Sequence, residues 1–328
     1  MTAPPPTIRS MLRRRPARAM LSGGTAYFVG NAMQAMAAAW LVVELTGSSF
    51  LAALVQTAVF LPMFLLALPA GVMADTTDRR RLMVGALGVQ AALVALLALL
   101  MLAGWLSAGA LLGLTFLIGC CTALMSPAWN SALVDTVPRD ELPLAIAAVG
   151  IGYNGARALG PAAAGWVYAQ WGPGWVFALA LLGVGALLQS VRRHPPPPHP
   201  PSRLPAERLW GGMLSALRFA RHSDIVLAQL IRTAAFGAAG SALWALLPAV
   251  AQQQLGLGAT GFGFLMACMG SGAVLSGLSI ARLRSRLGLE RLVLLCCGIF
   301  AGVMAVAAGS SQRWLVYPAL VAGGGAWM

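Results

Sequence analysis

The sequence has no lysine and few charges of any kind. Charged residues make up 9% of its 328 residues, whereas hydrophobic residues make up 59%. All 22 basic residues are arginine, and only nine residues are acidic. Soluble domains carry about 25% charged residues. The shortage of charge excludes a soluble globular domain of ordinary composition and is typical of an integral membrane protein.

Side chains that carry chemistry are also scarce. No aspartate or glutamate falls in the middle of an apolar run, and His194 and His199 lie in a proline tract with no cysteine or carboxylate beside them. The five cysteines lie inside apolar runs without CxxC spacing, which is typical of small apolar residues in membrane helices. The sequence therefore predicts no metal site, no cofactor and no enzyme, and a membrane enzyme is the weakest functional alternative.

Long apolar runs are abundant instead. A bilayer core of about 30 Å needs about 20 helical residues, and ten runs reach or approach that length. None alternates with a period of two, so helices are expected rather than barrel strands. The predicted spans are 20–45, 50–74, 82–106, 111–128, 144–169, 175–191, 225–251, 262–280, 292–308 and 314–328.

The arginines predict how these spans are oriented. With a cytoplasmic N-terminus, the inner loops hold nineteen arginines and the outer loops hold only Arg313, while Arg157 and Arg232 lie inside spans. Arginine collects on the cytoplasmic side of membrane proteins. We therefore expect a multi-pass membrane protein with its N-terminus in the cytoplasm. The positive charge then serves topology and contact with lipid, and nucleic acid is excluded as a partner.

A polar segment divides the spans into two groups. The stretch RRHPPPPHPPSRLPAER at 192–208 is too rich in proline to form a helix. The next residues place Trp210, Met213, Leu214 and Leu217 at helical spacing, which predicts a short interfacial helix. The expected organisation is a six-helix bundle at 1–191, a cytoplasmic linker at 192–222 and a second bundle at 223–328.

The two groups are expected to be repeats, the second one incomplete. Gly71 and Gly277, 206 positions apart, both lie at small-residue helix ends that run into arginines. Adding this offset to Val191, where the first group ends, places the end of a complete second group near residue 397. We expect a C-terminally truncated chain with about ten spans, unstable or inactive as it stands; a genuine ten-span protein is the alternative.

The charged stretch AGVMADTTDRRRLM at 70–83 resembles the loop signature between the second and third spans of the major facilitator superfamily. The resemblance implies a conformational latch made of Gly71, Asp75, Arg79 and Arg80, in which the aspartate joins one bundle to the other. Asp75 ends a helix and so needs a cationic or helix-N-terminal partner. Asp78 can cap the next helix. A cluster that only sets topology is the alternative.

A second motif, YNGARALGPAAAGW at 153–166, resembles the glycine–proline motif of span five in exporters and antiporters of this superfamily. Its residues are Arg157, Gly160, Pro161 and Gly165, with Gly155 before them. Small residues let a partner helix approach closely, and Pro161 removes the donor that would bond the carbonyl of Arg157. Because charge inside a membrane is costly, Arg157 is a functional candidate.

Polar side chains inside the spans are candidates for a substrate pathway. Tyr27, Asn31 and Gln34 fall at i, i+4 and i+7 and form one stripe on a helix. The others are Asn130, Asn154, Arg157, Gln229, Arg232 and Thr233. Interhelical hydrogen bonding is the alternative role of the amides, and a structural role is the alternative for Arg157.

Together with ELTGSS at 44–49, SPAW at 126–129 and LVDTVPRDELPLA at 133–145, these motifs resemble the branch of bacterial exporters that contains the enterobactin exporter and macrolide efflux proteins. The resemblance implies an all-α major facilitator fold of two six-helix bundles. It also implies a secondary active transporter that exports amphipathic small molecules, such as siderophores, macrolides or other drugs, across the inner membrane by alternating access.

The sequence does not decide whether transport is coupled to protons, and it leaves an alternative function open. Drug/proton antiporters of the superfamily often have an arginine four residues before a glycine in span four, and counting back from Gly119 gives Thr115. A coupling proton is therefore left open beside the small-molecule substrate and the lipid bilayer as partners. The alternative function is that of a non-transporting fragment or a partner-binding membrane subunit.

Overall fold

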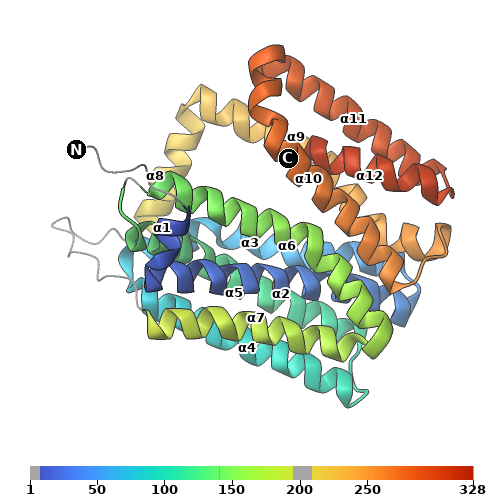
Figure 1. The fold of residues 1–328 in the computed structure, drawn as a ribbon, viewed down its shortest axis with the longest axis horizontal. Helices are drawn as coiled ribbons and strands as arrows, with labels where there is room; N and C mark the ends of the chain where they lie inside the picture. Colours follow the sequence, from blue (N-terminus) through green and yellow to red (C-terminus); the bar gives the residue numbers. More distant parts are fainter. Residues whose placement is uncertain (1–7, 140, 195–208, 328) are drawn as a thin grey trace.

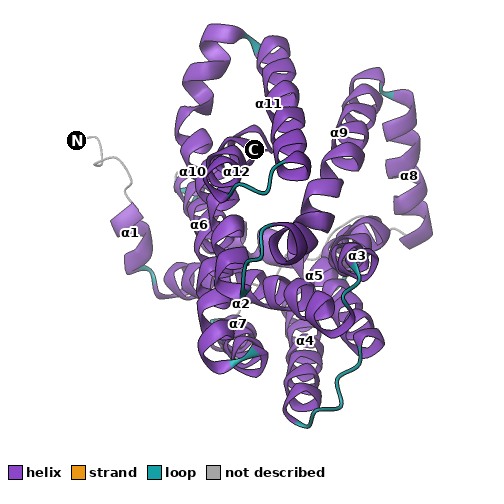
Figure 2. Ribbon diagram, turned by 90° about the vertical axis from the view of Figure 1, so that its right-hand side faces the viewer, coloured by secondary structure: helices purple, strands orange, loops and turns teal. Residues whose placement is uncertain are grey.

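In the residues that the computed structural model describes, 8–139, 141–194 and 209–327, all regular secondary structure is helical (Figures 1 and 2). The helices are α1 (Ile8–Arg13), α2 (Arg15–Thr46), α3 (Ser49–Thr76), α4 (Arg79–Leu102), α5 (Ala108–Thr136), α6 (Leu142–Trp171), α7 (Pro173–Arg193), α8 (Leu209–His222), α9 (Asp224–Ala249) with the π-helix η1 (Val250–Gln254), α10 (Ala259–Leu287), α11 (Leu289–Gly309) and α12 (Arg313–Trp327).

Each predicted span coincides with a helix. In the described part of the chain, eight helices are long and apolar enough to cross a membrane, namely α2, α3, α4, α5, α7, α9 with η1, α10 and α11. Helices α6 and α12 match two further predicted spans, and the count of about ten crossings stays a prediction. The expected interfacial helix is α8, whereas residues 195–208 of the predicted linker, His199 among them, lie outside the described residues.

Helix ends follow the capping chemistry of the sequence. Asp78 accepts a hydrogen bond from the amide of Arg81 at 3.0 Å, which confirms the predicted cap of α4. Gly47 ends α2 in the left-handed conformation, at φ 64°. Helix α5 continues past residue 128, where the fourth span is predicted to end, to Thr136, whose hydroxyl donates to the carbonyl oxygen of Ala132. The polar inner turns of α5 stay helical because Asp135 has a cationic partner, described below.

The helices pack as two groups. Helix α2 packs on α6 and α7, α3 packs on α5, and α4 packs on both α5 and α7, which makes α2 to α7 the first group. Helix α12 packs on α10 and α11, and its Trp327 packs on Trp244 of α9, so α9 to α12 form the second group. In Figure 1 the first group lies below and the second above. The strongest connection between them is α6 against α10.

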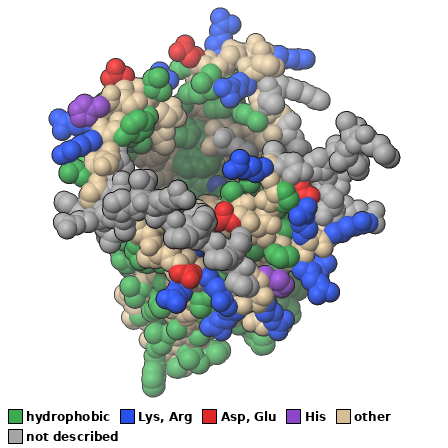
Figure 3. Space-filling view, turned by 90° about the vertical axis from the view of Figure 1, so that its left-hand side faces the viewer, with side chains coloured by type: hydrophobic (Ala, Val, Ile, Leu, Met, Phe, Trp, Pro, Cys, Tyr) green, Lys and Arg blue, Asp and Glu red, His purple; other side chains and the backbone are tan. Residues whose placement is uncertain are grey.

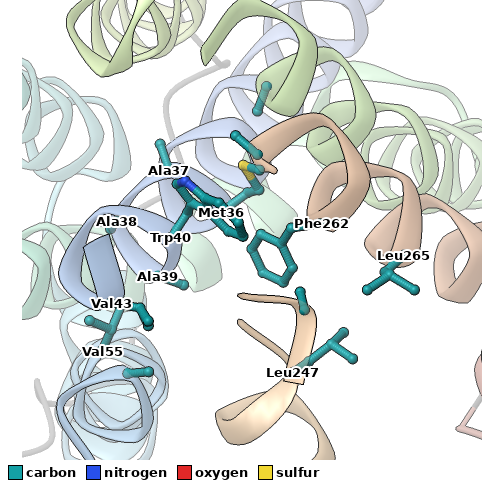
Figure 4. Close-up of a cluster of buried hydrophobic side chains, with 14 of the residues drawn as sticks. Met36, Ala37, Ala38, Ala39, Trp40, Val43, Val55, Leu247, Phe262 and Leu265 are labelled. Carbon is teal, nitrogen blue, oxygen red and sulfur yellow. The ribbon is translucent and has the colours of Figure 1, made fainter. Parts of the chain in front are cut away.

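The buried cores show where the groups meet. One core holds Met11 of α1 and residues from the half of the first group near α1, including Met20, Met83 and Trp129. Another core holds residues of both groups, and Figure 4 shows Trp40 of α2 and Val55 of α3 facing Leu247 of α9 and Phe262 and Leu265 of α10. The groups therefore share a hydrophobic core at the end of the molecule opposite α1.

Candidate functional site

The two groups separate toward the end that carries most of the arginines. We call this the arginine-rich end; it holds Arg79 to Arg81, Arg192, Arg193, Arg218, Arg221, Arg284 and Arg286. Figure 3 views the molecule from this end and shows a hollow with hydrophobic side chains on its floor and basic side chains around it. In Figure 1, α10 lies against α6 at the opposite end and diverges from it toward the arginine-rich end.

At the opposite end, here called the closed end, polar and aromatic contacts join the groups. Trp40 of α2 stacks on Phe262 of α10, with ring centroids 5.6 Å apart. Gln253 of η1 donates from Nε2 to the carbonyl oxygen of Gly47 at 3.1 Å. Thr260 of α10 donates from Oγ1 to the carbonyl oxygen of Gly165 at 3.3 Å. The hollow is therefore open at one end only.

The glycine–proline motif lies where α6 and α10 touch. A Cβ atom on Gly165 would come within 2.5 Å of the carbonyl oxygen of Ala259, and one on Gly263 would clash with the carbonyl oxygen of Pro161. Farther along, a Cβ on Gly270 would clash with Ala158 and lie 2.7 Å from the carbonyl oxygen of Arg157. The carbonyl oxygen of Arg157 lacks an amide partner because residue 161 is proline, and it faces Gly270, where α10 has no side chain.

Gly160 faces the other way, toward α2. A Cβ at Gly160 would lie 2.8 Å from the Cβ of Ala32. The motif therefore allows close approach on two sides of α6, to α2 and to α10. This is the packing expected of small residues, and its role in transport stays a prediction.

Arg157 lies between the groups. Its guanidinium carbon is 5.3 Å from the ring centroid of Trp244 on α9 and 5.9 Å from that of Tyr153 on α6. Within the described residues it makes no hydrogen bond or ion pair, and the buried Nε1 of Trp244 has no hydrogen-bond partner. The side chain of Gln56 on α3 donates to the carbonyl oxygen of Trp244 at 3.3 Å and holds that residue against the first group.

Aromatic rings extend from this arginine into both groups. Phe28 of α2 packs edge-to-face on Tyr153 and on Trp129, each with centroids 5.3 Å apart. On the other side Trp244 packs on Trp327 of α12 at 5.9 Å. The arginine therefore lies in an aromatic row that runs between the two groups.

The predicted latch is not formed in this conformation. Arg79 pairs with Asp135 of α5 at 2.5 Å between Nη1 and Oδ2 and donates from Nε to the carbonyl oxygen of Ala74 at 3.3 Å. Arg80 donates to the carbonyl oxygen of Arg192 at 3.2 Å. Asp75 is exposed and, among the described residues, makes no hydrogen bond or ion pair.

The expectation that Asp75 has a cationic or helix-terminal partner is therefore wrong for this conformation. Arg79, four residues after Asp75 in the sequence, folds back onto the end of α3 and pairs with Asp135. A Cβ at Gly71 would meet nothing within 4 Å, so packing does not require a glycine there either.

The sequence matches a known family. Residues 12–328 match the model of the family described as transmembrane secretion effector, within the major facilitator superfamily. The chain belongs to the transmembrane secretion effector family. No curated protein sequence matches it.

Solved transporters share the fold of this family member. A point mutant of the nucleoside transporter NupG has a TM-score of 0.71 at 14% identity, covering 95% of this chain and 80% of that one. An inward-facing, unoccupied bacterial homologue of the human lysosomal transporter Spinster has a TM-score of 0.64 at 16% identity, covering 95% and 73%. A bacterial homologue of the iron transporter ferroportin scores 0.60 inward-facing, at 17% identity over 95% and 80%.

The same ferroportin homologue scores 0.55 in its outward-facing state, at 17% identity over 95% and 81% of the two chains. At these identities the likeness shows the fold alone. Family and fold together identify a multi-pass membrane transporter of the major facilitator superfamily.

In this family member the polar stripe of α2 lies inside the first group. Tyr27 donates from Oη to Oε1 of Gln90 at 3.1 Å and lies 3.0 Å from Oγ1 of Thr122. Gln90 in turn donates from Nε2 to Oδ1 of Asn31 at 3.1 Å. Tyr27 and Asn31 thus join α2 to α4 and α5 through hydrogen bonds, and their place in a substrate pathway stays a prediction. Gln34 is 4% exposed, and its Nε2 has no partner among the described residues.

The remaining pathway candidates are scattered. Asn154 donates from Nδ2 to the carbonyl oxygen of Gly150 in its own helix at 2.9 Å. Asn130 is exposed on α5, and Gln229, Arg232 and Thr233 are exposed on α9. Of the predicted intramembrane polar residues, Arg157 is the one that the structure places directly between the groups.

Sequence reasoning missed several residues of the transporter that join the two groups. They are Gln56, Trp244, Gln253, Thr260 and Phe262. Each is an ordinary amide, hydroxyl or aromatic residue within or beside an apolar run, and the sequence gives it no distinctive spacing. Gly263 and Gly270 of α10, which face α6, are the signal that could have indicated its partner.

Proposed function

We propose that this transporter is a secondary active exporter of amphipathic small molecules that works by alternating access. The observation that carries the proposal is the hollow that is open at the arginine-rich end and closed at the other (Figure 3). Positive charge collects on the cytoplasmic side, so the hollow would open to the cytoplasm, where an export substrate enters. The higher score against the inward-facing ferroportin homologue supports this assignment.

The finer parts of the proposal rest on the sequence. They are a bacterial inner-membrane location with the N-terminus inside, a first bundle at 1–191, a linker at 192–222 and a second bundle at 223–328. Siderophores, macrolides and other drugs are the proposed substrate classes, with binding between the bundles. The proposed pathway residues are Tyr27, Asn31, Gln34, Asn130, Asn154, Arg157, Gln229 and Arg232.

The test is efflux from proteoliposomes combined with a reversible block of the closed end. Ser48→Cys and Gln253→Cys lie on the two sides of the closed contact, because Gln253 bonds the carbonyl of the residue before Ser48. With the five native cysteines replaced, a reducible bis-methanethiosulfonate cross-linker joins them. Erythromycin and Hoechst 33342 are the transported probes.

We expect efflux from uncross-linked protein, its loss on cross-linking and its recovery after reduction. Alternating access requires the closed end to open in every cycle. The single variants, treated in the same way, are the control for modification without a link. Efflux that continues through the cross-link would rule out alternating access. Failure to move either probe by a folded protein would favour the non-transporting fragment or partner-binding subunit.

A further inference from the structure

The arginine between the groups is flanked by rings and lacks an anionic partner. Arg157 has five N–H donors. Within the described residues it makes no hydrogen bond or ion pair, and its guanidinium lies over the rings of Tyr153 and Trp244. Cation–π contact offsets part of the cost of desolvating a guanidinium but uses none of its in-plane donors. An unpaired charge at membrane depth is costly, so these donors are available to an anion that enters from outside the chain.

A second donor lies beside the first. The Nε1 atom of Trp244 is buried and has no hydrogen-bond partner among the described residues, although the ring of Trp244 is the one against which Arg157 packs. Buried indole N–H groups usually have a partner. The guanidinium of Arg157 and the indole N–H of Trp244 are thus neighbouring donors without acceptors, which indicates a ligand with oxygen acceptors.

The site lies at the gap between the groups. Tyr153 lies one turn from Arg157 on the same face of α6, and this face is turned to α9, because Arg157 packs on Trp244. Tyr153 is 46% exposed although its ring packs on Phe28. An exposed ring on a face turned to the other group lies at the gap between the groups rather than in their cores.

The aromatic rings beside Arg157 favour a ligand with a flat part. The rings of Phe28 and Tyr153 on one side and of Trp244 and Trp327 on the other offer faces and edges on which a flat ligand can stack.

Acidic side chains are scarce around these rings. Helices α6, α9 and α12 carry one acidic residue within their bounds, Asp224, in the first turn of α9 at the arginine-rich end. Helix α2 carries Glu44, which accepts a hydrogen bond from Tyr168 at the closed end. A cationic ligand would therefore meet Arg157 without a compensating carboxylate.

We propose that Arg157, Tyr153 and Trp244 form the recognition site for a planar aromatic anion, of the aromatic carboxylate class. The carboxylate accepts hydrogen bonds from the guanidinium and from the indole N–H of Trp244, and the aromatic part stacks in the row of rings. This inference rests on the proposed function, because it names the substrate class of the exporter. It makes the site selective against aromatic cations and against aliphatic anions.

The test is equilibrium dialysis of the full chain in detergent, which measures binding without transport. The probes are radiolabelled 2-naphthoate, 2-naphthylmethylammonium and decanoate, which separate the charge from the ring. We expect 2-naphthoate to bind at least about tenfold more tightly than either of the others, the size of one good charge-assisted contact. Equal binding of the cation, or of decanoate, would overturn the proposal.

Variants assign the contact. Arg157→Gln should weaken 2-naphthoate binding by about tenfold or more, while Arg157→Lys should retain part of it, because a point charge replaces a planar fork. Trp244→Phe keeps a ring and removes the N–H, so it should cost about threefold to tenfold. Trp166→Phe is the matched control, since Trp166 is 52% exposed on α6 and packs on Trp171.

Helical circular dichroism and gel-filtration profiles show that each variant is folded. Unchanged 2-naphthoate binding in folded Arg157→Gln would overturn the proposal. Arg157-dependent binding of 2-naphthoate by a protein that exports no probe would leave the site in place and contradict the exporter. A protein that exports a probe but binds 2-naphthoate no more tightly than the other two ligands would support the exporter and contradict the proposed site.

Discussion

At the scale of single residues, the clearest polar contact at the closed end joins Glu44 to Tyr168. The tyrosine Oη donates to Oε2 of Glu44 at 2.5 Å, and Tyr168 is 8% exposed. Of the seven acidic residues that the structure describes, Glu44 is the one at the closed end. Its helix carries Trp40, and the helix of Tyr168 carries Gly165, so the bond joins the two first-group helices that meet α10.

We predict that Tyr168→Phe lowers the free energy of unfolding by about 1–3 kcal/mol, because a hydrogen bond to a charged acceptor is lost. Unfolding in mixed detergent micelles measures the effect. A double-mutant cycle with Glu44→Gln should give an interaction energy of about 1 kcal/mol or more. Tyr317→Phe is the control, since Tyr317 has no hydrogen bond among the described residues. If the effects of Tyr168→Phe and Glu44→Gln on the free energy of unfolding are additive, the hydrogen bond does not contribute to stability.

Contacts between neighbouring residues could be predicted from the sequence, whereas contacts between distant residues could not. The cap at Asp78 was predictable because capping is local, acting over three residues. The partner of Arg79 is 56 positions away, and Trp244 is 87 positions from Arg157. Such pairs depend on how each helix is rotated about its axis. In a membrane, lipid-facing and core-facing sides can both be apolar, so the sequence of a helix such as α3 does not reveal its inner face.

At the scale of helices, the contact between α6 and α10 depends on missing side chains. We predict that Gly270→Ala destabilises the protein by about 1–3 kcal/mol, because the added methyl group has no room against Ala158. Gly302→Ala on α11 is the matched control. A Cβ there meets nothing within 4 Å, and alanine favours a helix over glycine by about 1 kcal/mol. Unfolding in mixed micelles compares the two, and equal stability would contradict the close contact.

The helical type of the predicted spans was predictable, whereas their pairing was not. Long apolar runs specify helices because lipid offers backbone groups no other partners. Close packing of α6 was predictable in kind from Gly160, Pro161 and Gly165, since small residues have few other uses there. The identity of its neighbour, α10, comes from the tertiary arrangement of helices about a hundred residues apart.

At the scale of the whole molecule, the described conformation leaves Asp75 without a partner among the described residues, although its sequence context resembles a latch between bundles. A latch that is open here should form when the arginine-rich end closes. We predict that Asp75→Asn leaves this conformation unchanged in stability and shifts the population toward it, because a group favours the state in which it has a partner. A shift of about 1 kcal/mol would change the ratio of states about fivefold.

Cysteine labelling in membrane vesicles would measure this shift. Ile146→Cys reports on the open end, since Ile146 is 60% exposed on the side of α6 that carries Arg157, and Ala259→Cys reports on the closed end, where Ala259 is 7% exposed. With native cysteines replaced, Asp75→Asn should slow maleimide labelling at 259 and leave or raise labelling at 146. Asp78→Asn is the matched control, because it removes a neighbouring charge and keeps a side chain that caps α4. If both substitutions leave labelling at both positions as in the wild type, the charged loop between α3 and α4 sets topology and takes no part in switching.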